Sequence, residues 1–440
     1  MAIKREIEKV LDKAGSTSEQ AEVFSLSYWN EPVDFEANRL KTVEDRESKG
    51  LSLRIIKDGK IGFSSTNILD NLDAVVDNAL ETSPFGPVAA LQFPSGAMFK
   101  KVDTYDPRVE TQTVDEMVHL GQSLIDDLRT HEPELLCDAG VGRNVMEISI
   151  ANSNGLSASY RQSSFYVSIG ATLVNGTDMF FLGGSKSSCN PILNIDELVN
   201  SVLFQLENGR NIAKPASGNM QIIFTPRGVA AALLSPLMAG FNGKSIIKGS
   251  SPLVGMLGET LVDTRFSLWD EPLTPMIPGS RMFDDEGVAS RRMPLIDHGM
   301  ISNFLYDLQT AGQAGTESTG NAHRGINSLP SPGVSVSVIS SGDTSFQDMV
   351  AGIENGIIVE SLLGAGQSNI LSGDFSANVL LGYRIENGKI AGRLKNTVIT
   401  GNVYSALNNI AAIGNDGEWI GGSLYSPSIC CNDVSVATRG

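Results

Sequence analysis

The alternation of apolar and polar positions predicts both strands and helices near the start of the chain. Apolar side chains recur at spacings of three and four over residues 3–14 and 68–81, as on one face of a helix. Residues 21–28 alternate apolar and polar, the pattern of a half-buried strand, and residues 35–43 predict a second strand. The pattern therefore mixes helices and strands rather than favouring one of them.

A hairpin followed by a helix is predicted twice in the first half. The turns fall at Asp58-Gly59 and Asn154-Gly155, dipeptides that readily supply the positive φ angles of tight hairpins. The elements expected around the second turn are a helix over 114–130, strands over 145–151, 156–161 and 165–174, and a helix over 195–208. This repeated order allows an internal duplication.

A small, polar segment at residues 213–218 separates this half from the rest of the chain. A buried strand is predicted at 220–225, and Pro226 then opens a helix, where proline is tolerated. That helix is apolar nearly all round over 228–240, which indicates a helix buried at the centre of a domain.

The remaining sequence is rich in glycine and predicts mainly strands, with a hairpin turn at Asn387-Gly388. The expected strands are 299–307, 334–340, 356–363, 375–385 and 389–400, with short helices at 345–354 and 403–410. The predicted fold class is α+β, with a strand-rich, barrel-like second domain around one apolar helix. The expected domains are 1–212, with sub-repeats 1–85 and 113–212, and 219–440, joined by the 213–218 linker.

Composition narrows the classes of function. The chain has 440 residues, a formal net charge of −17 and a sequence pI near 4.7. Such a charge is repelled by phosphate backbones, so we expect no direct contact with nucleic acid. The N-terminal segment is charged, and no apolar stretch reaches membrane-spanning length, so a cytoplasmic protein without membrane contact is expected. Cys430 and Cys431 are adjacent and are expected to be reduced, with no role assigned.

The common catalytic motifs are missing from the sequence. It contains no Walker A loop, no GxGxxG after a strand and no GxSxG elbow. The pair His131-Glu132 has no second histidine at helical spacing, so no metal site is expected there. Among the four histidines, His323 has the strongest claim to a binding role because it lies in a Gly/Ser/Asn-rich loop beside Arg324.

Two acidic loops are further candidates. Asp284, Asp285 and Glu286 form one, and Asp374 precedes a long predicted strand. Carboxylates at such positions can serve as ligands or general bases, although they more often cap turns.

Taken in order, these loops resemble the TldD/PmbA family, once called modulators of DNA gyrase. The matching segments are ESKGLSLR at 47–54, GFSST at 62–66, FDDEGVA at 283–289, LYD at 305–307, STGN at 318–321, SGDFS at 372–376, GY at 382–383 and GN at 401–402. The resemblance covers almost the whole chain.

In TldD-like members, a helix with an HExxxH motif is described as holding a catalytic zinc. Aligning Leu233-Leu234 with the apolar pair before that motif places Ser235 and Pro236 at its His-Glu positions, and Gly240 at its second histidine. None of these three residues can do that chemistry. The resemblance therefore implies a PmbA/TldE-like member that holds no metal or other cofactor itself, with zinc expected in a TldD-like partner.

The resemblance also implies partners and substrates. We expect either a complex with a TldD-like protease subunit or a homodimer, acting on small or unfolded peptides that bind as an added strand. Residues that could line the substrate cavity are Arg54, Asp284, Glu286, Asn321, His323, Arg324 and Asp374.

Two alternatives remain open at the level of the sequence. One is an independent hydrolase that uses Cys430 and Cys431, or Asp374 with His323. The other is a non-proteolytic binding protein that regulates a partner such as gyrase.

Overall fold

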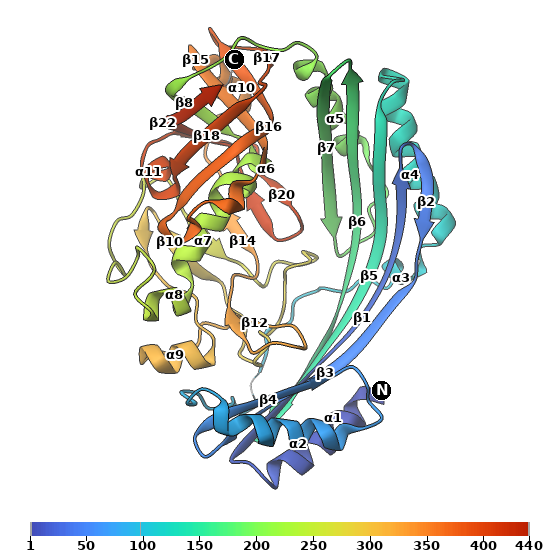
Figure 1. The fold of residues 1–440 in the computed structure, drawn as a ribbon, viewed down its shortest axis with the longest axis vertical. Coiled ribbons are helices and arrows are strands. Elements are labelled where there is room, and N and C mark those ends of the chain that lie inside the picture. The colour runs from blue at the N-terminus through green and yellow to red at the C-terminus, as the bar shows by residue number, and fades with distance from the viewer. Residues whose placement is uncertain (1, 97, 439–440) are drawn as a thin grey trace.

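One long, twisted antiparallel sheet dominates the first half of the chain (Figure 1). The structure, a computed structural model, describes residues 2–96 and 98–438. Within those residues the strands follow the order β4-β3-β1-β5-β6-β7, with β2 paired to β1. They are β1 (Gln20–Glu36), β2 (Arg39–Val43), β3 (Arg46–Lys57), β4 (Lys60–Thr66), β5 (Leu136–Asn152), β6 (Ser157–Asn175) and β7 (Asp178–Ser188).

The sheet runs outward from a central β1–β5 pair in the same way on both sides. Each central strand is followed along the chain by a hairpin, β3–β4 after β1 and β6–β7 after β5, and then by a helix. The internal duplication stays a prediction, as do the expected domain limits.

Helices cover one face of this sheet near both of its ends. α1 (Ala2–Gly15) and α2 (Leu72–Thr82) bury Val23, Leu53 and Ile55. At the other end lie α3 (Arg108–Thr111), α4 (Val114–His131) and α5 (Asp196–Gly209), which cover Phe35 and Val167. Their apolar stripes supply the burial that holds the helices on the sheet.

A closed barrel of five strands forms the core of the second half. Its strands follow the order β15-β8-β22-β18-β16, and β16 pairs back onto β15. They are β8 (Gly218–Phe224), β15 (Asn355–Leu363), β16 (Asp374–Glu386), β18 (Thr397–Asn402) and β22 (Ile429–Thr438), with β17 (Lys389–Arg393) paired to β16 and β19 (Ile410–Ile413) to β22. The predicted α+β class with a barrel-like second domain is confirmed.

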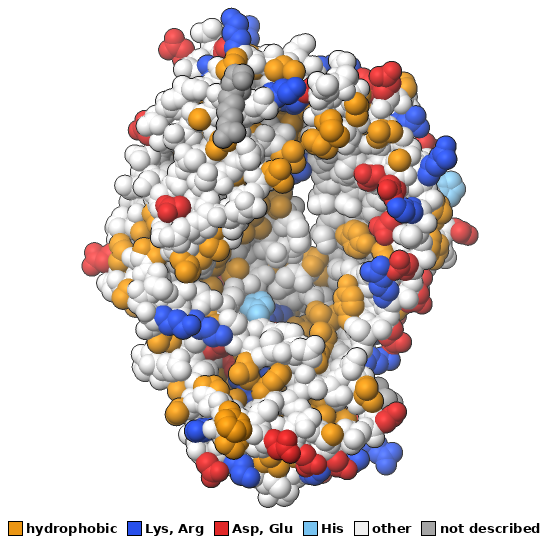
Figure 2. All heavy atoms as spheres, viewed as in Figure 1, with side chains coloured by type: hydrophobic (Ala, Val, Ile, Leu, Met, Phe, Trp, Pro, Cys, Tyr) orange, Lys and Arg blue, Asp and Glu red, His pale blue; other side chains and the backbone are white. Residues whose placement is uncertain are grey.

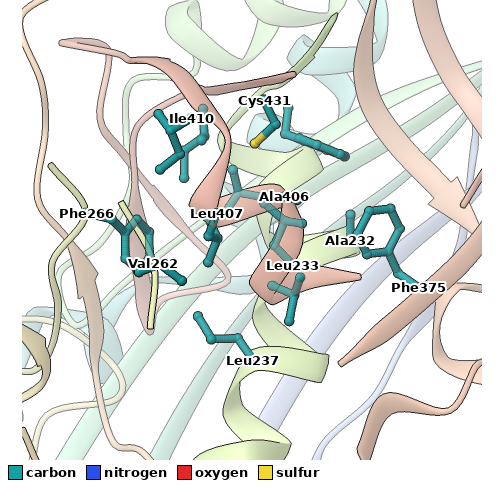
Figure 3. Packing of buried hydrophobic residues seen from close by; sticks show 14 of the residues in the cluster. Ala232, Leu233, Leu237, Val262, Phe266, Phe375, Ala406, Leu407, Ile410 and Cys431 are labelled. Atoms are coloured by element: carbon teal, nitrogen blue, oxygen red, sulfur yellow. The ribbon is translucent and has the colours of Figure 1, made fainter. Parts of the chain in front are cut away.

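The predicted apolar helix packs into this barrel. It consists of α6 (Pro226–Val229), a π-helical turn over residues 230–234 and α7 (Ser235–Phe241). Leu233 and Leu237 share one core with Phe375, Leu407 and Cys431 (Figure 3). Pro236 has no N–H to bond the carbonyl four residues earlier, and we attribute the widened π turn directly before it to that loss.

A layer of short strands and loops lies below the barrel in Figure 1. Its sheet has the order β11-β10-β9-β14-β21-β20, and β12 pairs with β13. The strands are β9 (Leu268–Asp270), β10 (Met293–Asp297), β11 (Met300–Ile301), β12 (Ala322–His323), β13 (Ser331–Pro332), β14 (Ser337–Ile339), β20 (Glu418–Ile420) and β21 (Leu424–Ser426). The remaining helices are α8 (Gly243–Ile247), α9 (Leu308–Ala314), α10 (Phe346–Ala351) and α11 (Val403–Asn408), with 3-10 turns at Ser83–Phe85, Ala365–Gln367 and Ile370–Ser372.

The two halves meet where α5 and β7 approach the barrel. Phe204 on α5 contacts Tyr383 on β16 edge to face, with ring centroids 6.3 Å apart. The buried Arg393 guanidinium on β17 donates to Asp178 Oδ2 at 2.5 Å and to the Gly209 carbonyl at 3.2 Å. The joint therefore combines apolar packing with a buried charge-assisted hydrogen bond.

Several predicted strands are wrong in extent. Only Ser337–Ile339 of the strand expected over 334–340 is a strand, and the two strands expected over 156–161 and 165–174 form the single strand β6. The strand expected over 299–307 stops at Ile301. Ser302 still donates to the Leu295 carbonyl of β10, but Leu305 donates to the Phe241 carbonyl at the end of α7 and so leaves the sheet. The strand expected over 35–43 is broken by the left-handed Ala37 and Asn38. The strand expected over 389–400 becomes β17 and β18, separated by Asn396 with φ of 51°.

Several strands were missed by the pattern. They include the first half of β5, all of β7 and β22, and the short strands β9, β10, β12, β13 and β19 to β21. In the described part of the chain, no helix is long and apolar enough to cross a membrane.

Candidate functional site

The three positions that align with the zinc motif differ in their surroundings. Ser235 is exposed, whereas Pro236 and Gly240 are buried. A Cβ added at Gly240 would lie 2.3 Å from the Tyr404 hydroxyl and 3.1 Å from Leu253. The Gly240 position is therefore filled by a tyrosine from α11, which leaves no room for a histidine side chain.

The two C-terminal cysteines face different cores. Cys431 points into the barrel core beside the central helix (Figure 3). Cys430 packs in a different core, the one that includes α5. Both are buried, and burial raises the pKa of the Cys430 thiol to about 12 and that of Cys431 further still. A nucleophile or metal ligand must be a thiolate, so neither cysteine is suited to the role left open for it.

These residues do not fit a zinc ion. Serine, proline and glycine supply no zinc ligand of the usual kind at the aligned positions. Among the described residues, no group of three or more His, Cys, Asp or Glu side chains is arranged to hold a metal.

A buried network of charges instead gathers four of the candidate residues. Arg54 on β3 donates from Nη1 to Glu286 Oε1 at 2.6 Å and from Nη2 to Glu22 Oε2 at 3.1 Å. Arg324 Nη1 reaches the same Glu22 at 2.9 Å. Asp284 is also buried. It lies two residues before Glu286, and its negative charge raises the pKa of the Glu286 carboxyl. The network joins the N-terminal sheet to the acidic loop of the second half, so it fixes one half of the molecule against the other.

The acidic loop is folded around its own carboxylates. Asp284 Oδ1 accepts the N–H groups of Glu286 and Val288, and its Oδ2 accepts that of Ala322. Glu286 Oε2 accepts the Leu308 N–H at 2.6 Å, at the start of α9. These contacts are turn capping at the centre of the molecule, the more common reading of such a loop.

Burial dominates the electrostatics of this loop. Removal from water raises the pKa of Asp284 to about 6 and that of Glu286 to about 7, although Arg281 and Arg54 oppose the respective shifts. Neighbouring carboxyls at Asp284, Asp307 and Glu22 raise the Glu286 pKa further. The loop thus holds carboxyl groups that exchange protons near neutral pH.

His323 lies next to this network on β12. Its Nε2 is 2.8 Å from Nη2 of Arg281. Burial, together with the Arg281 charge, lowers the pKa of His323 to about 3, so its imidazole is uncharged at neutral pH. Asn321 belongs to the same region and donates to the buried Asp270 at 2.5 Å.

Asp374 is the one candidate that the structure places elsewhere. It begins β16 at the barrel end, where its Oδ1 accepts a hydrogen bond from Asn402 at 2.9 Å. Asp374 and His323 thus contact different residues, so the structure gives no support to a catalytic pair formed by these two side chains. The other six candidates, Arg54, Asp284, Glu286, Asn321, His323 and Arg324, lie within one region.

Sequence reasoning missed three charged members of the region. Glu22, Asp270 and Arg281 are all buried and all contact a candidate residue. Asp285, in the predicted acidic loop but not among the predicted cavity residues, is buried as well and accepts the Arg324 N–H. Glu22, in contrast, lies at a polar position of a strand in which apolar and polar residues alternate. That pattern predicts a side chain exposed to solvent rather than one in a buried ion pair.

The fold and site together define an α+β protein with a closed barrel, a central helix and a buried polar joint between its halves. Three domain profiles of one family match the chain: PmbA/TldA metallopeptidase domain 1 over residues 21–83, the central domain over 107–207 and the C-terminal domain over 217–438. The chain belongs to the PmbA/TldA metallopeptidase family.

Relatives that are named as metalloproteases agree with this assignment. A metalloprotease of Methanothermobacter thermautotrophicus is 26% identical over 86% of this chain and 84% of its own length. The metalloprotease PmbA of Escherichia coli O157:H7 is 30% identical over 43% of this chain and 40% of its own. The role is therefore, at the level of the family, that of a metalloprotease.

Solved structures share the fold. TldE from Thermococcus kodakarensis superposes with a TM-score of 0.89 at 22% identity, covering 98% of this chain and all of that one. A Thermotoga maritima protein whose name associates it with modulation of a DNA gyrase has a TM-score of 0.88 at 22% identity, covering 99% and 100% of the two chains.

Proposed function

We propose that this chain is the PmbA/TldE-like subunit of a two-component metalloprotease, and that catalytic zinc is held by an HExxxH-bearing partner. The observation that carries the proposal is the position of Gly240, where the Tyr404 hydroxyl occupies the space a second histidine would need. Ser235 and Pro236 add no ligand beside it. The family's fold is kept while the chemistry of its metal centre is missing.

The part we assign to this chain is to bind and position a peptide. Figure 2 shows a deep hollow between the long sheet and the barrel. β7 forms one edge of the sheet, with β6 as its strand partner. Gln205 and Arg227 already bond the outward N–H and carbonyl of Gly183, so an extended peptide is proposed to pair with the rest of that edge. Backbone hydrogen bonds of that kind demand little of the peptide's sequence, which suits substrates that are short or unfolded.

Of the six candidates in the buried region, His323 and Arg324 line a cavity, and we assign these two to the substrate space. Arg54, Asp284, Glu286 and Asn321 are almost fully buried, and we assign them to its support. Most of these side chains bond to one another or to loop backbone, so they position the two halves of the molecule. Asp374 holds the Asn402 side chain at the barrel end.

A reconstitution experiment tests the proposal. The chain is purified alone and mixed with an HExxxH-bearing relative from the same genome, and cleavage of an unfolded peptide is followed by mass spectrometry. We expect cleavage in the mixture and none by this chain alone. A partner with the motif glutamate replaced by glutamine serves as the control, and its mixture is expected to be inactive. Peptide cleavage by this chain without any partner would contradict the proposal.

A further inference from the structure

Two buried side chains of β6 each leave one polar atom without a partner. Tyr160 and Gln162 are both 8% exposed. In the part of the chain that the structure describes, the Tyr160 hydroxyl and Gln162 Oε1 make no hydrogen bond, yet neither atom is fully enclosed by protein. Polar atoms in buried side chains are normally bonded, because an unsatisfied one costs stability. These two atoms are therefore free to bond a ligand.

Both side chains line a cavity of about 260 Å³ between the two halves of the molecule. Its apolar floor consists of Phe24, Leu26, Met146 and Ile148, on the face of the long sheet that α1 and α2 leave uncovered. Residues 278–281, from the second half of the chain, form another part of the wall. Sites for whole small molecules typically measure about 300–1,000 Å³, so this cavity suits a single residue of a longer chain.

The charged groups of the cavity wall already have partners. Arg281 donates three hydrogen bonds of 2.8 to 2.9 Å, one of them to the uncharged His323. Arg324 pairs with the buried Glu22 at 2.9 Å. Asp285 Oδ2 accepts the Arg324 backbone N–H at 2.8 Å, and its Oδ1 lies 3.7 Å from Nη1 of Arg281. The positive and negative charges of the wall thus offset one another, which favours an uncharged ligand.

The two free atoms have opposite hydrogen-bonding roles. Burial raises the pKa of the Tyr160 hydroxyl, and the charge of Asp285 raises it further, so the hydroxyl keeps its proton and donates. Gln162 Nε2 donates to the Ser280 carbonyl at 2.9 Å, which fixes the amide so that Oε1 is the free acceptor. The two residues lie two positions apart on β6, so their side chains stand on the same face of the sheet.

A donor and an acceptor above an apolar floor select a particular ligand chemistry. Each residue of a peptide carries one carbonyl acceptor and one N–H donor, and in an extended chain these need partners outside the chain. We propose that this cavity binds one apolar residue of an extended peptide, with Tyr160 donating to its carbonyl and Gln162 accepting its N–H. The apolar floor then covers the side chain of that residue. The proposal rests on the proposed function, since the peptide is the substrate bound there.

Calorimetric titration of the full chain tests this directly. The probes are the uncharged peptide N-acetyl-alanyl-leucyl-alaninamide, the same peptide with a methyl group on the leucine nitrogen, and the same peptide with alanine in place of leucine. We expect the first to bind about tenfold more tightly than either of the others. The methyl group removes the N–H that Gln162 accepts, and alanine leaves the apolar floor uncovered. This comparison uses the unmodified protein, so it does not depend on whether a variant folds.

Two variants then locate the effect. Tyr160→Phe keeps the ring but removes the donor, so the affinity for the leucine peptide should fall about tenfold. Gln162→Met removes the acceptor, so the difference between the leucine peptide and its N-methyl form should fall to about onefold. Tyr166→Phe is the matched control, because Tyr166 stands on the same face of β6 but lies over Gly142 and outside this cavity. Its affinity for the leucine peptide should not change.

Equal binding of the leucine peptide and its N-methyl form by the unmodified protein would overturn the inference, and so would an unchanged affinity in Tyr160→Phe. Equal binding of the leucine and alanine peptides, or no binding of any of the three, would overturn it as well. Any of these results together with cleavage in the two-component mixture would refute this subsite alone. The proposed function fails separately, when the mixture does not cleave.

Discussion

Arg54 places a permanent positive charge where it has almost no contact with water. Its side chain is 2% exposed, and Glu22 and Glu286 beside it are fully buried. The network is balanced only while all members are present, because removing one partner leaves an uncompensated buried charge. Removing one member of this network should therefore lower the free energy of unfolding more than removing one member of an exposed ion pair.

Replacing Arg54 with alanine is therefore expected to lower the free energy of unfolding by about 3–5 kcal/mol. Lys13→Ala removes a cation that pairs with Asp73 and Asp77 at the surface, where Lys13 is 37% exposed. That change should cost far less, because water screens an exposed ion pair. Urea denaturation of both variants checks the difference, and equal effects would show that the network adds little.

The acidic loop makes stability depend on pH. An unfolded glutamate titrates near its ordinary pKa, whereas Glu286 in the folded protein titrates at about 7 and Asp284 at about 6. At pH values between the ordinary carboxyl pKa and these raised pKa values, the folded state binds more protons than the unfolded state. The contribution of Asp284 and Glu286 to stability therefore falls as pH rises from about 5 to 8.

Glu286→Gln removes one of these titrations. The free energy of unfolding of the variant, relative to the unmodified protein, should therefore rise with pH over the same interval. Denaturation curves at a series of pH values measure it, with Glu116→Gln at an exposed capping box as the control, whose glutamate has a lowered pKa. A difference that is flat between pH 5 and 8 would show that Glu286 titrates normally.

At this scale the sequence pointed to the right loop but not to all of its partners. Asp284 and Glu286 stood out as an acidic cluster, and the structure places them in the buried region. The burial of Glu22 could not be predicted from its own strand, because it depends on packing against the acidic loop. Glu286 of that loop lies 232 positions after Arg54, the residue that joins it to Glu22. Strand alternation alone assigns such a side chain to solvent.

Among the elements, the central helix carries the strongest departure from a regular pattern. Apolar side chains nearly all round this helix correctly predicted that it is buried. Pro236 explains the π turn before it. What periodicity does not show is which neighbour fills the space at a glycine. Tyr404 does so here, and its hydroxyl has no hydrogen-bond partner among the described residues.

Gly240→Ala is expected to destabilise the protein by about 1–3 kcal/mol, because the new Cβ and the Tyr404 hydroxyl cannot share the space. Tyr404→Phe deletes that hydroxyl. In a double-mutant cycle, the cost of Gly240→Ala should be clearly smaller in the Tyr404→Phe background. Thermal unfolding of the four proteins measures the coupling, and additive effects would mean that the two side chains do not compete.

Strand boundaries were predicted least well where small residues break the alternation. The first half of β5 contains Gly140 and Gly142, so its apolar count is too low to predict a strand, although Tyr166 on β6 lies over Gly142. Left-handed residues such as Asn38 and Asn396 split two predicted strands, and a sequence pattern does not report φ.

For the whole molecule, the α+β class and the strand-rich second half follow from local patterns, and the barrel's closure does not. β8 and β15 pair in parallel although more than a hundred residues separate them, and β16 closes the ring. Such pairings are decided by packing of distant segments. The family resemblance supplied what periodicity could not, namely the helix on which to look for the metal ligands.

The central claim is that this chain keeps the family's scaffold without its metal centre. The most direct test is zinc content by mass spectrometry of the purified chain, measured together with hydrolysis of an unfolded peptide before and after chelation. We predict zinc far below one ion per chain, with no hydrolysis for the chelator to abolish. About one tightly bound zinc per chain, together with hydrolysis that the chelator removes, would contradict the account.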